Sequence, residues 1–119
     1  MNEGPRKHNI STSRIHIIMM NSIYILQLAE HVRSGENIYK VGFTELQPRK
    51  LLQRCPKGSE LNFFFAIPGV PEAKILKGLK AQFEQRHDCG PEYFQGDFHF
   101  MVDCIMSLAI HSSRTLEGL

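Results

Sequence analysis

Long apolar segments are missing from this sequence. No run approaches the roughly 20 residues that a transmembrane helix requires, and residues 1–9 are polar, without the apolar core of a secretory signal. The three cysteines have no Cys-x-x-Cys spacing and cannot all pair within the chain, which argues against a zinc knuckle and agrees with a reducing compartment. We therefore expect a cytoplasmic or nuclear protein with no membrane partner.

The sequence also has little excess of charge of either sign. Its formal net charge of +2 is too small to indicate nucleic-acid binding by itself. The basic residues nevertheless gather in clusters, and each cluster has two open interpretations, a surface that binds phosphates or an ordinary solvated face. The clusters are Arg6, Lys7 and Arg14, then Arg49, Lys50, Arg54 and Lys57, then Lys74, Lys77 and Lys80.

Length and patterning predict one small domain. The 119 residues suit a single core, and 42% hydrophobic with 22% charged residues is close to the globular average. Segments rich in β-branched and aromatic residues predict strands at 22–28, 38–43 and 61–67, the last buried on both faces. Helical spacing and breakers predict helices at 48–54, 71–85 and 97–110. We expect an α/β fold of the α+β kind, a small, mostly antiparallel three-stranded sheet flanked by helices, at residues 20–111, with an N-terminal arm at 1–19 and a tail at 112–119.

Several short motifs follow one another along these elements. The first predicted strand carries Ser22-Ile23-Tyr24, the second carries Lys40-Val41-Gly42, and the next helix carries Arg49. Glu72 begins the following helix, and Glu92-Tyr93-Phe94-Gln95-Gly96-Asp97 precedes the last one. Over residues 21–106 this order resembles the GIY-YIG endonuclease superfamily, and more closely its divergent branch in phages and large DNA viruses. Two features depart from the family: Lys40 stands where the second signature tyrosine belongs, and the Asn after the Glu has no counterpart.

The resemblance implies a metal-dependent DNA endonuclease that hydrolyses phosphodiester bonds with Mg²⁺ or Mn²⁺. It implies a catalytic set, in which Glu72 is also the metal ligand, and a set that binds the nucleic acid. The catalytic set is Tyr24, Tyr39, Lys40, Arg49 and Glu72; the binding set is Gly42, Lys50, Arg54 and Lys77. Tyr39 is an alternative to Lys40, on the opposite face of the strand if the pairing is regular.

Each of these side chains suits the chemistry and also has a simpler interpretation. Tyr24 would orient or deprotonate the attacking water, or else packs in the sheet. Arg49 would bind phosphate, or else lies free on the surface. Lys40 would contact phosphate, act as a base of lowered pKa, or protect a strand. Glu72 would bind Mg²⁺, or else is a favourable charge at a helix N-terminus.

Other polar groups are interpreted structurally. The stretch from Glu92 to Asp97 is expected to anchor a turn, with Asp97 capping the last helix. Cys89 beside His87 and Asp88 is expected to form a polar turn rather than a metal cluster. The alternative function is a catalytically inactive module on the same scaffold that binds nucleic acid or protein. A homodimer, a host or viral protein partner, and the host cell of a DNA virus as the location are all open.

Overall fold

A hairpin of two buried strands is the centre of the computed structural model, which describes residues 21–67, 69 and 71–117. Strand β1 (Asn21–Gln27) is connected through helix α2 (Ala29–Ser34) to strand β2 (Ile38–Thr44), and helix α3 (Pro48–Gln53) follows. Strand β3 (Glu60–Ile67), helix α4 (Glu72–Gln82) and the short strands β4 (Glu84–Gln85) and β5 (Tyr93–Gln95) lead to helix α5 (Phe98–Glu117).

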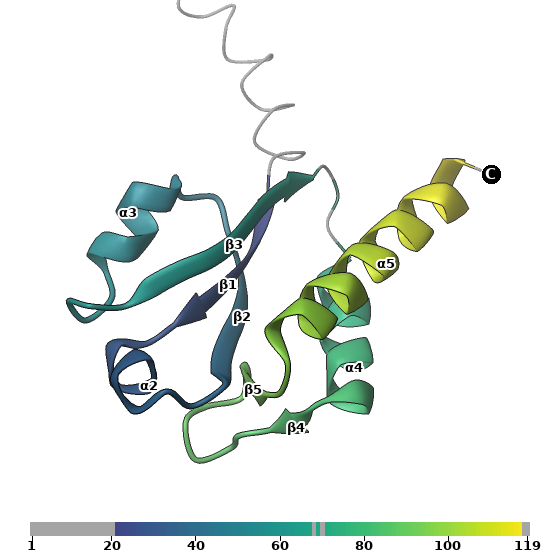
Figure 1. Cartoon of the computed structure of the whole chain (residues 1–119). Helices are drawn as coiled ribbons and strands as arrows, with labels where there is room; N and C mark the ends of the chain where they lie inside the picture. Colours follow the sequence, from purple (N-terminus) through teal and green to yellow (C-terminus); the bar gives the residue numbers. More distant parts are fainter. Residues whose placement is uncertain (1–20, 68, 70, 118–119) are drawn as a thin grey trace, which may run out of the picture.

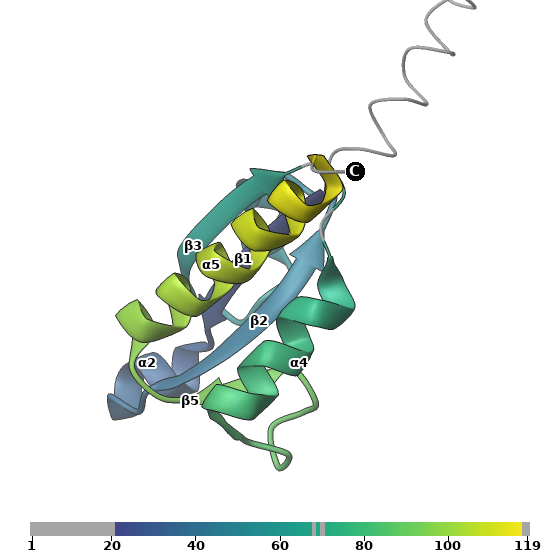
Figure 2. The same ribbon diagram turned by 90° about the vertical axis from the view of Figure 1, so that its right-hand side faces the viewer.

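All described strands form one antiparallel sheet, in the order β3-β1-β2-β5-β4. Helices α4 and α5 lie on one side of the sheet and α3 lies on the other (Figure 1). Turned by 90°, the molecule shows α5 and α4 in front of the long strands (Figure 2). The expected α+β class is confirmed. The sheet has five strands rather than three, because two- and three-residue strands carry no periodicity that a sequence reveals.

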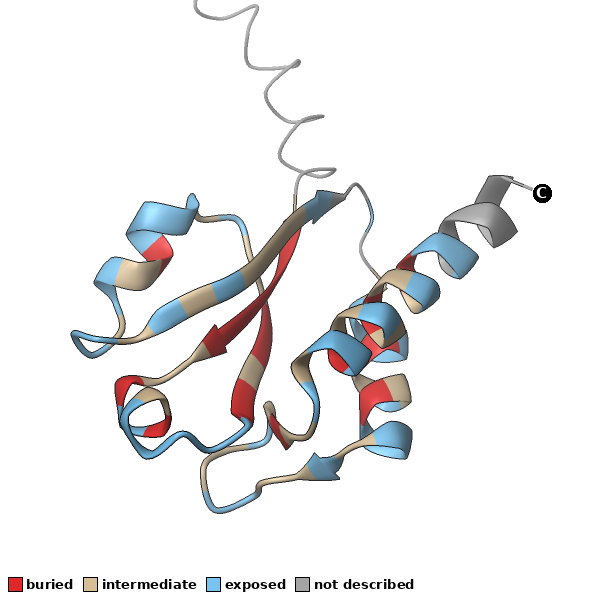
Figure 3. Cartoon of the chain, viewed as in Figure 1, coloured by how far each residue is buried: buried red, intermediate tan, exposed pale blue. Residues whose placement is uncertain are grey.

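Alternation along the strands divides the apolar side chains between two clusters. The larger cluster lies between the sheet and the pair α4 and α5, and the smaller one lies under α3. The buried members of the larger cluster are Ile23, Ile25, Tyr39, Val41, Ile75, Leu79, Phe94, Met101 and Ile105. Those of the smaller cluster are Tyr24, Leu26 and Leu51. Figure 3 shows β1 and much of β2 as buried, with the buried residues of α4 and α5 facing them.

Strand β3 was expected to be buried on both faces, and this prediction is wrong. It pairs only with β1 and forms an edge of the described sheet. Phe63, Phe64 and Phe65 are only partly buried, although Phe63 and Phe65 stack with ring centroids 6.3 Å apart. An apolar run does not distinguish a central strand from an edge strand that is half covered by helices.

Two smaller differences and one confirmed prediction concern helices. The connection between β1 and β2, where no helix was predicted, contains the six-residue helix α2, which ends at Gly35 with a left-handed φ of 74°. Helix α5 continues to Glu117, across the predicted boundary between domain and tail. The prediction that Asp97 caps this helix is confirmed, because the backbone N–H of Phe100 donates to Asp97 Oδ2 over 2.8 Å.

The N-terminal arm predicted at residues 1–19 lies outside the described residues. Among the described helices, none combines the length and the apolar character that a membrane crossing requires. The predicted polar turn around Cys89 is confirmed. Its amide donates to the carbonyl of Arg86, and the guanidinium of Arg86 pairs with Asp88 at 2.8 Å.

Candidate functional site

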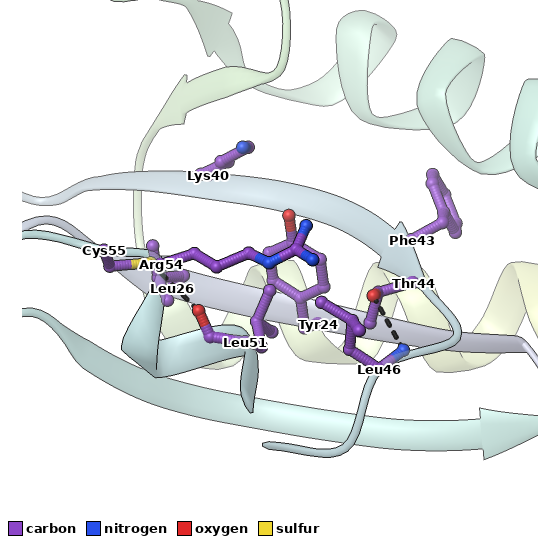
Figure 4. Close-up of a pocket in the computed structure, with 9 residues that line it drawn as sticks. All are labelled: Tyr24, Leu26, Lys40, Phe43, Thr44, Leu46, Leu51, Arg54 and Cys55. Atoms are coloured by element: carbon purple, nitrogen blue, oxygen red, sulfur yellow. Dashed lines mark hydrogen bonds between the residues drawn. The ribbon is translucent and has the colours of Figure 1, made fainter. Parts of the chain in front are cut away.

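A hollow of about 290 Å³ opens on the face of the sheet that α3 covers. Its polar lining comes from three elements, with Tyr24 on β1, Lys40 and Thr44 on β2, and Arg54 and Cys55 at the end of α3. The apolar lining is Leu26, Phe43, Leu46 and Leu51. In Figure 4 the Arg54 side chain extends across the hollow toward the Tyr24 ring, while the Phe43 ring points away from it.

Register places Tyr24 and Gly42 opposite one another on neighbouring strands. A Cβ atom on residue 42 would lie only 2.4 Å from both Cζ and Oη of Tyr24. The hydroxyl end of the Tyr24 ring therefore lies against Gly42, and any side chain there would displace it. Gly42 was expected among the residues that bind nucleic acid, and the group that approaches it closely in the structure is Tyr24 of this chain.

Lys40 lies on the same face as Tyr24, paired with Leu26 on β1 and with Tyr93 on β5. Burial lowers the pKa of Lys40. Attraction to Tyr24, Tyr93 and Glu92, together with a hydrogen bond to Tyr24, outweighs burial, so the pKa of Lys40 is above its ordinary value. This direction favours the ammonium form of Lys40 and is opposite to the lowered pKa that a lysine base would need.

The two arginines of the α3 region are placed differently. Arg54, which was expected in the binding set, lines the hollow, whereas Arg49, which was expected in the catalytic set, is exposed and does not line it. Lys50 is also exposed on α3. Lys77 lies on α4, on the other side of the sheet (Figure 1). The structure thus brings together only Arg54 from the predicted phosphate-binding cations, next to Lys40.

Tyr39 and Glu72 are both away from the hollow. Tyr39 is buried in the larger cluster and packs against Phe98, with ring centroids 5.6 Å apart. This agrees with the expectation that it faces opposite to Lys40. Glu72 is the first residue of α4, and its Oε2 accepts a hydrogen bond from Asn21 Nδ2 over 2.9 Å. Asn21 is an odd-numbered residue of β1, so its side chain lies on the face opposite to Tyr24.

Glu72 was expected to bind Mg²⁺ or Mn²⁺. Its Oε2 oxygen is engaged by the amide of Asn21. Within the described ranges, no group of three or more His, Cys, Asp or Glu side chains is arranged to hold a metal ion. Glu72 is in the position of a favourable charge at a helix N-terminus, directly after Pro71.

Sequence reasoning assigned Glu92 and Tyr93 to structure alone, and both lie close to the hollow. Tyr93 pairs across the strands with Lys40, and the carbonyl of Glu92 accepts a hydrogen bond from the Val41 amide over 3.0 Å. Burial raises the pKa of Tyr93, although Lys40 opposes this rise. Tyr93 and Lys40 are 53 residues apart in the sequence, and β5 has only three residues. No local sequence pattern therefore indicates that the two residues pair.

One phenol, one ammonium and one guanidinium therefore line a single hollow, and Tyr93 is the cross-strand neighbour of Lys40. Such a set attracts an anion and offers the Tyr24 hydroxyl group as an additional hydrogen-bond partner. Leu26 and Leu51, which line the same hollow, belong to the smaller apolar cluster. No protein-family model, no curated protein and no solved structure was found to match this chain.

Proposed function

We propose that this protein binds nucleic acid through the hollow between β1, β2 and α3, with backbone phosphate held by Lys40 and Arg54. The observation that carries the proposal is the convergence of both cations on one concave surface, which also contains the Tyr24 hydroxyl group. Arginine presents a planar fork of donors that matches phosphate, and the raised pKa of Lys40 keeps its ammonium charged.

Two features make the hollow suitable for this task. Tyr24 is 6% exposed and fixed against Gly42, so its hydroxyl group is held in place before a ligand arrives. The apolar floor lowers the local dielectric constant, which strengthens attraction between phosphate and the two cations. Lys50, which is exposed on α3, extends the positive surface beyond the rim.

Arg54→Ala is the direct test, with Arg49→Ala as a matched control. Both arginines are exposed and belong to the α3 region, but only Arg54 lines the hollow. We expect Arg54→Ala to weaken binding of a fluorescent oligonucleotide about tenfold at low salt, because one charge-assisted contact to phosphate is lost. It should also lower the salt slope of binding by about 1, while Arg49→Ala changes both quantities much less. Equal effects of the two variants, or wild-type retention that salt does not alter, would contradict the proposal.

An endonuclease is the second candidate function. It is favoured by one observation, the Tyr24 phenol held in the hollow beside Lys40, since a positioned phenol can orient a water for attack on phosphorus. In that case the chain would use Mg²⁺ or Mn²⁺, as the resemblance to the GIY-YIG superfamily implies. Glu72, the expected ligand of that ion, begins α4 and accepts a hydrogen bond from Asn21, away from the hollow.

Cleavage of supercoiled plasmid with Mg²⁺ or Mn²⁺ separates the two functions. An endonuclease would nick the plasmid, and Tyr24→Phe, which keeps the ring over Gly42, would reduce the rate by about 100-fold. Glu72→Ala would abolish cleavage only if that carboxylate reaches the substrate from the other face. If the wild type binds the plasmid and leaves it intact with either ion, the binding module is the better description.

A further inference from the structure

The hollow has an apolar floor as well as a charged rim. Leu26, Leu46 and Leu51 line it beneath Lys40 and Arg54. A nucleic-acid duplex presents its phosphates and sugars outward and keeps its bases stacked inside. A duplex backbone would therefore contact the rim and leave the floor unfilled. An unpaired base, which is flat and largely apolar on its faces, would complement the floor.

Tyr93 provides an aromatic ring at the side of the same surface. It pairs directly with Lys40 on β2, so the two side chains lie on the same face of the sheet. The ring packs on the backbone of Gly90, where an added Cβ would lie 3.0 Å from two ring carbons. Tyr93 is partly exposed and is held by the turn that precedes β5. A fixed, partly exposed ring beside a phosphate-binding cation is the arrangement that proteins use to stack unpaired bases.

We propose that this site selects single-stranded nucleic acid, with a phosphate at Lys40 and Arg54 and an adjacent base stacked on Tyr93. This inference rests on the proposed function, since it names the form of nucleic acid that the hollow accepts. Lys40 and Tyr93 are neighbours on adjacent β-strands. A phosphate bound by Lys40 would therefore have its adjacent base close to the Tyr93 ring, since each phosphate of a nucleic-acid chain is next to a base.

The experiment compares three labelled ligands with the full chain. One is a short single strand, one is the duplex of the same sequence, and one is an abasic strand with the same number of phosphates. Binding is followed by fluorescence anisotropy with wild type, Tyr93→Leu, Tyr93→Phe and Arg54→Ala. DNA and RNA versions of the single strand identify which source of this chemistry is preferred.

We expect the wild type to bind the base-bearing strand about tenfold more tightly than the abasic strand or the duplex. Tyr93→Leu should lose this advantage and leave abasic binding unchanged, which also shows that the variant is folded. Tyr93→Phe should keep it. Arg54→Ala should weaken binding of every ligand. The sequence has no Trp, so tyrosine fluorescence can be observed directly. Stacking of a base on Tyr93 should quench the portion of this fluorescence that the Tyr93→Phe variant lacks.

Two results would overturn the inference while the proposed function stands. One is equal wild-type affinity for the base-bearing and abasic strands. The other is a loss with Tyr93→Leu that is the same for every ligand, which would assign Tyr93 to structure. If the wild type shows no salt-dependent binding to any of the ligands, the proposed function itself fails, and the two failures are thereby distinguished.

Discussion

Replacing Phe94 with alanine is expected to lower the free energy of unfolding by about 3–5 kcal/mol. Phe94 has no exposed surface and belongs to the larger cluster, and it lies in β5 between β2 and β4. Truncation leaves a cavity that a short strand, paired on both sides, cannot collapse to fill. Because small domains are stable by only about 5–15 kcal/mol, the loss is a large share of the total. Urea unfolding followed by far-UV circular dichroism measures it.

Phe100→Ala is the matched control for this change. Phe100 is 50% exposed at the start of α5, where its ring lies 5.2 Å from that of Phe83. We expect the control to cost only about 1 kcal/mol, the size of one aromatic pair at a surface. Similar losses for the two variants would mean that β5 does not belong to the cooperative core.

Gly42→Ala is expected to destabilise the fold by about 1–3 kcal/mol and to remove nucleic-acid binding as well. The new Cβ would lie 2.4 Å from Cζ and Oη of Tyr24, so the ring must leave its position over the strand. Gly42 is not at a positive φ, and the expected loss therefore comes from the contact and not from backbone strain. Urea unfolding and oligonucleotide anisotropy measure the two effects.

A double-mutant cycle with Tyr24→Leu separates this contact from any general cost of a methyl group. Leucine is shorter than tyrosine and removes the atoms that the new Cβ would meet. Gly42→Ala should therefore cost much less in the Tyr24→Leu background, with a coupling energy of about 1–2 kcal/mol. Additive losses in the cycle would show that Tyr24 does not lie over Gly42 in solution.

Most of the fold was predictable because its long elements carry strong periodic patterns. The β-branched and aromatic residues of β1 and β2, and the helical spacing of Ile75 and Leu79 in α4, specify local structure directly. Helix α2 was missed because its six residues end in turn-forming residues, and β4 and β5 were missed because they are shorter still. The edge position of β3 depends on chain topology, which an apolar run does not encode.

The site was predictable only where strand alternation sufficed. Tyr24, Lys40 and Gly42 share one face because pairing of β1 with β2 follows the register that a regular hairpin gives. The position of Glu72 depends on which face of the sheet α4 covers. The position of Tyr93 depends on the pairing of β5 with β2. Both are long-range features, and the motif order that suggested Glu72 contains no information about which face its helix covers.

The apolar side chains are divided unequally between the two faces of the sheet. The face covered by α3 is therefore expected to have the lower local stability. Helix α3 has six residues and is anchored by one buried side chain, Leu51, whereas α4 and α5 are anchored by several. Detaching α3 exposes little apolar surface, so its amide hydrogens should exchange through local opening long before the chain unfolds. Because Arg54 directly follows α3, each such opening would also displace Arg54 from the hollow.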